Sequence, residues 1–487
     1  MGRCVMPGMG RVKELESMSS SRAEQQLALH GSMKAVTQIE GKGQPKIGIE
    51  EFMAVSERFG FSTKTLDAIR KALEKEDLGG GPFLGNYYAG LKETRVQAFE
   101  RVARETFGVK YAIGVSSGTG ALHSAFVAAG VGPGTEVICP AIGFYATAAA
   151  VVTAKGVPIF CDVDASLAMD PTKIEELITQ RTVAIAPTHV MGTVCNMSAI
   201  MRIARKHKLR VVEDCAQSCG GTFRGKRVGT FGDLGCFSIS CYKIVGGGEG
   251  GLIVANDKRL WERANQLAEC GGLWRPDRFA LPRYENEIFC GTNYRMSELE
   301  AAVDVVQLKR MPATVKRSNA VKMRVLRELK TFKEIAPQRL NDPAGDVGYL
   351  LRFFPETVEL GARIVEALRA EGVSCGGRAA GRASSAMMRR RSDMPDWHLY
   401  SYMYPITLQA GPNGPECVYT CKHYTDAGGR VEYARGDCPV ADDLYERVIN
   451  VTLNQWHTAR DCRSIAKGIN KVLSAYCTPG PKAAKWL

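Results

Sequence analysis

Between residues 110 and 256, short apolar runs alternate with stretches of helical spacing, and this alternation constrains the fold of the 487-residue chain most strongly. The apolar runs recur at intervals of roughly 15 to 30 residues, which is typical of strands joined by crossover helices. Such strands form a mainly parallel sheet that is buried on both faces. The pattern therefore predicts an α/β fold with a seven-stranded sheet flanked by helices. The predicted strands are 111–116, 135–141, 158–164, 182–190, 209–216, 234–240 and 250–256, and the predicted helices around them are 94–108, 120–131, 143–156 and 197–209.

The N-terminal part of the chain has a different character. Residues 1–45 are polar and weakly patterned, which indicates a flexible tail. Helical spacing follows over 52–60 and 66–76, and the glycine cluster at 77–90 predicts a loop. We expect one large domain over 46–310 that contains the sheet and this N-terminal helical segment.

The C-terminal part is predicted to form a smaller α+β domain at 311–478, followed by a tail at 479–487. A long and mostly helical segment, interrupted at Pro312, connects it to the large domain. The apolar run at 399–408 indicates a strand, and the spacing over 461–476 predicts a closing helix.

Charge and cysteine content limit the partners that we expect. The net charge is +13, but the positive charges are dispersed, and no nucleic-acid-binding motif surrounds the densest cluster, Arg389–Arg391. The sequence has neither an apolar run of membrane-spanning length nor a secretory signal, so we expect a cytoplasmic protein without membrane or nucleic-acid partners. The 16 cysteines are interpreted as free thiols. Cys417, Cys421 and His423 lack a second ligand pair, so we expect no metal.

A glycine-rich turn, GVSSGTG at 114–120, comes directly after a predicted strand and directly before a predicted helix. At a helix N-terminus, free backbone N–H groups and the helix dipole favour an anion such as a phosphate. Many turns between a strand and a helix look like this, so the turn is only a weak indication of a site.

Two further segments carry candidate catalytic side chains. Asp214 ends a buried strand, at the edge where open α/β sheets bind ligands, although a helix N-cap explains such an aspartate equally well. Lys243 follows another buried strand and precedes a glycine run. Apolar surroundings lower the pKa of a lysine and suit an imine-forming amine, whereas most single lysines only extend to solvent. A phosphate cradle, a strand-end aspartate and a lysine together match the needs of pyridoxal phosphate, which must be held by its phosphate, its ring nitrogen and its aldehyde.

Residues of about 60 to 475 resemble the DegT/DnrJ/EryC1/StrS family of sugar aminotransferases, which have the fold of fold-type I pyridoxal-phosphate transferases. Seven segments carry the resemblance in order and spacing: SSGTGAL (116–122), PAIGFYAT (140–147), FCDVD (160–164), PTHVMG (187–192), VVEDCAQSCGG (211–221), FSISCYKIVGGGEGG (237–251) and GTNYRMSELEAA (291–302).

The resemblance implies two catalytic residues and several cofactor contacts. Lys243 is implied to form the Schiff base with the cofactor, and Asp214 to pair with its pyridinium nitrogen. Gln217 is expected near the hydroxyl of the ring, and Phe144 on its face. His189 is expected close by, in a less defined role.

Further contacts implied by the resemblance concern the phosphate. Gly118, Thr119 and Ser238 are expected to hold it within one chain. Asn293 is expected to reach the cofactor phosphate of a second subunit, because the active sites of this family lie at a homodimer interface.

The implied reaction is a ping-pong transfer of an amino group from L-glutamate or L-glutamine to a keto-sugar, which is nucleotide-linked, phosphorylated or a cyclitol. A basic loop with Arg389–Arg391 is a candidate for binding a phosphate of that substrate, because guanidinium groups match phosphate oxygens. A solvated loop explains these arginines equally well.

Three alternatives remain beside the transaminase. A sugar dehydratase with the same cofactor is disfavoured by the presence of Lys243, since such relatives carry histidine there. A catalytically silent binding or sensor protein on the same fold is a second alternative. An NAD-linked oxidoreductase is disfavoured, because the glycine pattern Gly246-x-Gly248-x-x-Gly251 precedes a predicted strand and not a helix.

Overall fold

The computed structural model describes residues 23–38, 47–76, 84, 92–271, 289–378 and 396–487. The chain divides into two compact units, residues 1–83 and 84–487. The first unit contains η1 (Glu24–Gln26), η2 (Ala28–His30), α1 (Ile49–Glu57) and α2 (Thr63–Leu73), which confirms the two helices expected there. Ser62 caps α2, and Arg70 of α2 pairs with Glu50 of α1. The glycine cluster predicted as a loop lies outside the described residues, except for residue 84.

A seven-stranded sheet in the order β1-β9-β8-β5-β4-β2-β3 forms the centre of the second unit. All neighbouring pairs from β8 to β3 are parallel, and β9 runs antiparallel to both β1 and β8. Each strand overlaps one of the predicted runs, so the mainly parallel α/β sheet is confirmed. The strands are β1 (Tyr111–Val115), β2 (Glu136–Pro140), β3 (Val157–Cys161), β4 (Thr182–Ile185), β5 (Arg210–Asp214), β8 (Leu234–Ser238) and β9 (Gly251–Ala255).

Helices cover both faces of this sheet, and its strands are therefore buried on both sides. One core joins the sheet to α4, α5 and α8, and a second core joins it to α3, α7 and α9. The helices are α3 (Arg95–Phe107), α4 (Gly118–Ala128), α5 (Ala146–Thr153), α7 (Met197–His207), α8 (Lys258–Ala268) and α9 (Glu298–Arg327). Shorter elements between them are α6 (Pro171–Ile174), η3 (Glu175–Leu177), η4 (Val190–Gly192) and the hairpin of β6 (Thr222–Phe223) and β7 (Lys226–Arg227).

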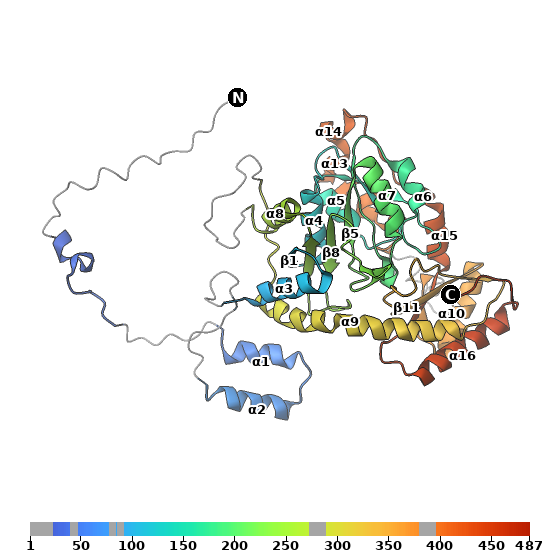
Figure 1. Ribbon diagram of the computed structural model, residues 1–487, viewed down its shortest axis with the longest axis horizontal. Helices are drawn as coiled ribbons and strands as arrows, with labels where there is room; N and C mark the ends of the chain where they lie inside the picture. The colour runs from blue at the N-terminus through green and yellow to red at the C-terminus, as the bar shows by residue number, and fades with distance from the viewer. Residues whose placement is uncertain (1–22, 39–46, 77–83, 85–91, 272–288, 379–395) are drawn as a thin grey trace. The chain divides into compact units, whose positions relative to one another are not determined.

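A smaller antiparallel sheet, β10-β11-β15-β12, packs with α9, α10 and α16 around a third core. Figure 1 shows α9 passing from the large sheet, beside α3, to this smaller sheet, beside α16. The predicted domain boundary at residue 310 falls inside α9, and the division into domains stays a prediction. The elements are β10 (Ile335–Pro337), β11 (Leu350–Pro355), α10 (Val358–Ala370), β12 (Cys375–Gly376), β15 (Ile449–Thr452) and α16 (Ala459–Tyr476).

Two local predictions are wrong. The run 399–408 forms η7 (Tyr400–Tyr402) and α12 (Tyr404–Thr407) instead of a strand, because Pro405 has no N–H for a strand ladder and sits in the first turn of α12. Pro312 does not interrupt α9, which continues through it. Leu308 and Met311 are buried on this helix, and such packing offsets the loss of one backbone hydrogen bond.

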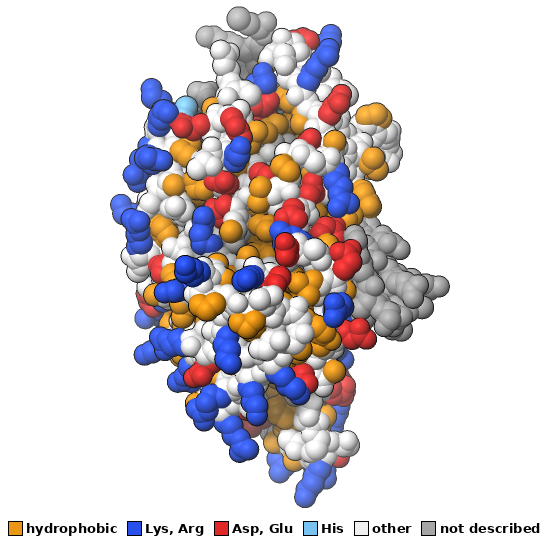
Figure 2. Space-filling view, turned by 90° about the vertical axis from the view of Figure 1, so that its right-hand side faces the viewer, with side chains coloured by type: hydrophobic (Ala, Val, Ile, Leu, Met, Phe, Trp, Pro, Cys, Tyr) orange, Lys and Arg blue, Asp and Glu red, His pale blue; other side chains and the backbone are white. Residues whose placement is uncertain are grey.

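The rest of the C-terminal region packs on the large sheet through short elements. These are β13 (Ala410–Gly411), β14 (Gly414–Pro415), α13 (Cys417–Thr420), α14 (Lys422–Thr425) and α15 (Pro439–Arg447). The face drawn in Figure 2 carries Lys and Arg side chains that are scattered among acidic and apolar ones. Among the described helices, none is both long and apolar enough to span a membrane.

Candidate active site

Asp214 ends β5 at the carboxyl edge of the parallel strands, as predicted, and is 2% exposed. Thr147 on α5 donates a hydrogen bond to Asp214 Oδ2 at 2.6 Å, and the Ala216 N–H donates to Oδ1 at 3.0 Å. These bonds hold the carboxylate in one orientation. Thr147 belongs to the 140–147 segment, but no sequence signal linked its hydroxyl to Asp214.

The predicted phosphate-binding turn lies beside the end of β8. Ser117 caps α4 by accepting the Gly120 N–H at 3.0 Å. A Cβ atom on Gly118 would lie 2.7 Å from Ser238 Cβ, so only glycine allows the turn to approach the strand end this closely. Thr119 is exposed in the same turn. The structure therefore brings Gly118, Thr119 and Ser238 together at a helix N-terminus, where an anion is favoured.

Lys243 lies in the turn after β8, where its N–H donates to Ser240 O at 2.9 Å. Burial lowers the pKa of its ammonium group, and the carboxylates of Asp214 and Glu249 oppose this shift. A lysine with a lowered pKa has a larger neutral fraction, which is the form that attacks a carbonyl. The Lys243 ammonium group is thus partly buried and interacts electrostatically with the Asp214 carboxylate.

Phe144 lies between β2 and α5 and is 43% exposed. Its ring centroid is 5.4 Å from that of His398, and the two ring planes meet at 51°. His398 comes from the C-terminal region, and no sequence signal indicated that it lies beside Phe144.

Gln217 is buried one turn after Asp214. Its Oε1 accepts the Met191 N–H at 2.8 Å, and its backbone oxygen accepts the Tyr349 hydroxyl at 2.9 Å. Met191 has a φ of 47°, in the left-handed region that non-glycine residues rarely adopt. Gln217 is therefore held by a constrained turn and by a tyrosine that precedes β11.

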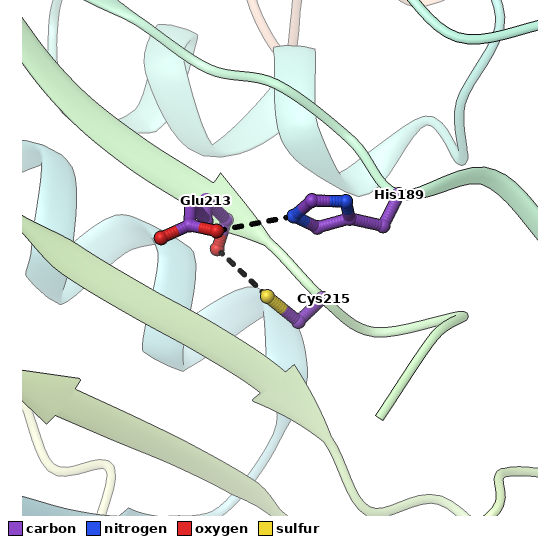
Figure 3. A group of neighbouring side chains, drawn as sticks. All are labelled: His189, Glu213 and Cys215. Atoms are coloured by element: carbon purple, nitrogen blue, oxygen red, sulfur yellow. Dashed lines mark hydrogen bonds and ion pairs between the residues drawn. The ribbon is translucent and has the colours of Figure 1, made fainter. Parts of the chain in front are cut away.

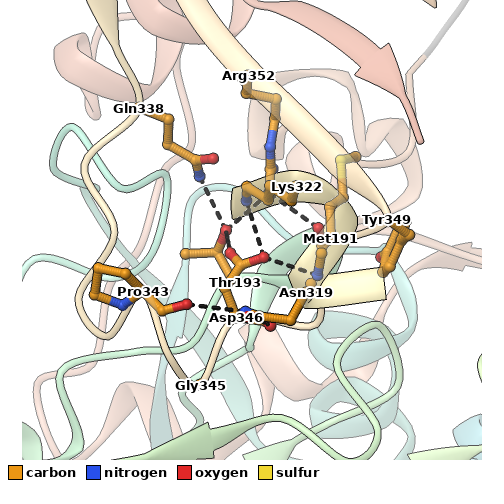
Figure 4. A network of polar contacts seen from close by, with 12 residues as sticks. Met191, Thr193, Asn319, Lys322, Gln338, Pro343, Gly345, Asp346, Tyr349 and Arg352 are labelled. Carbon is orange, nitrogen blue, oxygen red and sulfur yellow. Dashed lines mark hydrogen bonds and ion pairs between the residues drawn. The ribbon is translucent and has the colours of Figure 1, made fainter. Parts of the chain in front are cut away.

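A buried polar network behind that turn connects it to the smaller sheet (Figure 4). Arg352 of β11 donates through Nη2 to Met191 O at 3.0 Å and to Thr193 Oγ1 at 2.9 Å. Thr193 donates to Asp346 Oδ2 at 3.1 Å, and Asp346 Oδ1 lies 2.9 Å from Lys322 Nζ. Lys322 thus pairs directly with the Asp346 carboxylate, whereas Arg352 reaches it through Thr193, and burial lowers the pKa of both Lys322 and Arg352. The network fixes the turn that holds Gln217.

His189 is fully buried, and both of its ring nitrogens are engaged by the protein. Nδ1 accepts the Cys195 N–H at 3.1 Å, and Nε2 lies 3.2 Å from Glu213 Oε2. Successive side chains of a strand point to opposite faces, so Glu213 and His189 lie on the face of β5 opposite to the Asp214 carboxylate. A role for His189 at the cofactor stays a prediction.

His189, Glu213 and Cys215 form a group whose potential ligand atoms lie within 4.8 Å of one another (Figure 3). The Glu213 carboxylate also accepts the N–H groups of Gly229 at 2.8 Å and Phe231 at 2.7 Å. Burial raises the pKa of the Cys215 thiol well above its ordinary value, and His189 Nδ1 and both Glu213 carboxylate oxygens already accept backbone N–H groups. We interpret this group as a structural hydrogen-bond network.

Asn293 is exposed, and its Oδ1 accepts the Arg295 N–H at 3.1 Å. Its predicted contact with the cofactor of a second subunit stays a prediction. Arg389–Arg391 lie outside the described residues.

Known proteins are similar to this chain in sequence. The sequence profile of the DegT/DnrJ/EryC1/StrS aminotransferase family matches residues 89–377. GDP-perosamine synthase from Caulobacter vibrioides is 42% identical over 214 residues, which cover 44% of this chain and 56% of that protein. A putative L-glutamine:3-amino-2,3-dideoxy-scyllo-inosose aminotransferase from Micromonospora echinospora is 34% identical over 63% of this chain and 72% of its own length. The matched segments thus span between just over half and about three quarters of these two relatives.

Solved structures agree with the fold. The aminotransferase from Psychrobacter cryohalolentis superposes with a TM-score of 0.63 at 26% identity, over 85% of this chain and 98% of that chain. NtdA from Bacillus subtilis, with bound PMP cofactor, superposes with a TM-score of 0.63 at 23% identity, over 90% of this chain and 87% of that chain, which supports the fold alone. Because the family profile covers more than half of the sequence and the fold agrees, this chain belongs to the DegT/DnrJ/EryC1/StrS aminotransferase family.

Proposed function

We propose that this chain is a pyridoxal-phosphate-dependent aminotransferase that moves an amino group from L-glutamate or L-glutamine to a keto-sugar or keto-cyclitol. One observation carries the proposal: a buried aspartate, a lysine of lowered pKa and a glycine-lined helix N-terminus meet at one edge of the sheet. The names of the relatives support the substrate class, since they include a GDP-perosamine synthase and aminotransferases for scyllo-inosose derivatives.

The residues present fit pyridoxal phosphate. A Cβ on Gly118 would lie 2.7 Å from Ser238 Cβ, so glycine lets Ser238 pack against the first turn of α4, where a helix N-terminus favours a phosphate. The Asp214 carboxylate carries one hydrogen bond on each oxygen and keeps lone pairs for a cationic ring nitrogen. The exposed ring of Phe144 offers an apolar surface for a flat ring.

Bound pyridoxal phosphate would supply an aldehyde for amines and a ring that takes up an electron pair. Asp214 would keep the ring nitrogen protonated, with Thr147 holding the carboxylate in place. The Lys243 amine, once displaced by the amino donor, would act as the general base that moves a proton from the donor's α-carbon. Its lowered pKa favours this role, because a neutral amine can accept a proton.

We further propose that two copies of the chain share their active sites. The exposed side chain of Asn293, on a segment next to β1, supports a contact with the phosphate site of a second subunit. Measurement of the mass in solution tests the dimer independently of catalysis.

The absorbance spectrum of the purified protein, before and after L-glutamate or L-glutamine, tests the proposed function. We expect a visible cofactor band that disappears with the donor. Lys243→Ala should abolish the response, whereas Lys110→Ala, at an exposed lysine, should leave it intact. A colourless protein, or a coloured one that ignores both donors, would instead support the silent binding protein or dehydratase chemistry.

A further inference from the structure

A C-terminal segment beyond the family-matched residues is joined to the loop that carries Phe144. The Gly143 N–H donates to His398 O at 2.9 Å, and the Tyr145 N–H donates to Trp397 O at 2.7 Å. These bonds place the side chain of His398 beside the ring of Phe144. A part of the chain that the family profile does not cover therefore borders the proposed cofactor site.

The segment is anchored firmly. Leu399 and Tyr400, which follow His398, are fully buried in the core of the large sheet. The Tyr400 N–H donates to Ala141 O at 2.8 Å, and its hydroxyl donates to Asp442 Oδ2 at 3.0 Å. His398 itself is held by these neighbours, while about a third of its side chain (32%) stays exposed.

Asp396 orients the imidazole of His398. Asp396 Oδ1 lies 3.1 Å from His398 Nδ1 and also accepts the His398 N–H at 3.1 Å. A carboxylate at Nδ1 favours the tautomer with hydrogen on Nδ1, which leaves Nε2 as a hydrogen-bond acceptor. Among the described residues, Nε2 has no hydrogen-bond partner.

The surroundings of Asp396 keep it ionised and in place. Burial raises the pKa of Asp396, but bonds from His398 and Tyr445 outweigh this and lower it overall. Arg378 Nη1 lies 4.0 Å from Asp396 Oδ2 and offsets part of its charge. An acceptor at Nε2 suits a hydroxyl group, which can donate a hydrogen bond to it.

We propose that His398 Nε2 accepts a hydrogen bond from a ring hydroxyl of the keto-sugar or keto-cyclitol, which makes His398 a specificity-determining residue. This inference rests on the proposed aminotransferase function and concerns its second half-reaction only. The amino donor, with its carboxylates, does not need this contact. Asp396 is a positioning residue that acts through His398.

The two half-reactions separate the contributions of donor and acceptor. The holoenzyme is first converted by L-glutamate or L-glutamine, each tried in turn, and the rate is followed by cofactor absorbance. The converted enzyme then receives 2-deoxy-scyllo-inosose or UDP-N-acetyl-3-dehydro-α-D-glucosamine, which are named in the relatives' activities. The return of absorbance gives kcat/KM. Calorimetry with the unconverted holoenzyme, which holds no amino group to transfer to the keto probe, gives Kd.

We expect His398→Ala to lower kcat/KM for the accepted probe by about 10- to 100-fold and to weaken its binding similarly, as the loss of a hydrogen bond in a substrate site predicts. The donor half-reaction should change less than about twofold. His398→Gln, whose amide can reach the position of Nε2, should restore part of the loss. Asp396→Asn should give an intermediate loss, and His423→Ala, on α14, should have none.

Each outcome decides between the two proposals. Equal second half-reactions in the wild type and His398→Ala would overturn the role of His398 and leave the aminotransferase intact. A comparable loss in both half-reactions would mean a structural role and would also overturn it. An enzyme that accepts the donor but neither probe would refute the substrate class, and the inference with it. A failure of the donor half-reaction in the wild type would refute the proposed function itself.

Discussion

Asp214 and Asp304 are both buried carboxylates near the turn of Lys243, but their surroundings differ. Each Asp214 oxygen accepts a hydrogen bond, as described above. Asp304, on α9, is fully buried, and among the described residues its carboxyl group interacts with Glu300 and not with an N–H or hydroxyl donor. It faces Glu300 and the glycine run after Lys243, and a Cβ on Gly247 would lie 2.5 Å from Asp304 Oδ1.

The comparison shows that the neighbours of a buried carboxyl group matter as much as its burial. Burial and the neighbouring Glu300 raise the pKa of Asp304 to about 8, so this side chain is mostly protonated at neutral pH. Asp214 sits where a hydroxyl and an N–H point at it, and these donors suit a charged acceptor. The strand end therefore supplies hydrogen-bond donors to Asp214, whereas the position on α9 keeps the Asp304 carboxyl group mostly protonated.

The largest expected effect separates the two aspartates by activity. Asp214→Asn should lower kcat by about a thousandfold or more, because the amide cannot stabilise a protonated ring nitrogen as a carboxylate does. Asp304→Asn should change kcat by less than about threefold. Steady-state kinetics with saturated cofactor measure both, and similar losses in the two variants would end the distinction.

A second test concerns stability at the neighbour of Asp214. Glu213→Gln replaces one acceptor oxygen by a donor facing backbone N–H groups, so it should lower the free energy of unfolding by about 3 kcal/mol. Denaturant unfolding of the apoprotein measures this. An unchanged denaturation midpoint would show that the stability of the protein does not depend on the charge of the buried Glu213 carboxylate.

The third test uses pH. Between about pH 4 and pH 8, the unfolded chain has released the Asp304 proton and the folded chain still holds it. The free energy of unfolding therefore falls as the pH rises through this window. Asp304→Asn removes the titration. The variant should therefore be more stable than the wild type by several kcal/mol near pH 8, with little difference near pH 4. Unfolding curves at the two pH values check the sign, and a constant difference would contradict it.

The smallest effect concerns the donor to Asp214. Thr147→Val keeps the shape of the side chain but removes its hydroxyl, so kcat should fall by about tenfold. Thr153→Val, at an exposed threonine of the same helix, should be silent. If both variants match the wild type, the orientation of Asp214 does not depend on Thr147.

Much of the fold was predictable because its signals are local. The seven strands, the crossover helices and the strand-end position of Asp214 follow from apolar periodicity and turn residues within short windows. The lowered pKa of Lys243 was anticipated from its apolar flanks. The helical structure of residues 399–408 was not predictable, because their apolar side chains fit a strand equally well. Only the tertiary structure shows that Leu399 and Tyr400 are buried against the large sheet.

The sequence by itself determined the α/β class and the family, and it marked Asp214, Lys243 and the glycine turn as candidate site residues. Only the tertiary structure decided that Thr147 supports Asp214, that His189 faces Glu213, and that His398 lies beside Phe144. The physical reason is distance along the chain: 254 positions separate His398 from Phe144, and backbone bonds in the folded state join their segments. Periodicity reports which residues are buried, but not which partner each of them meets.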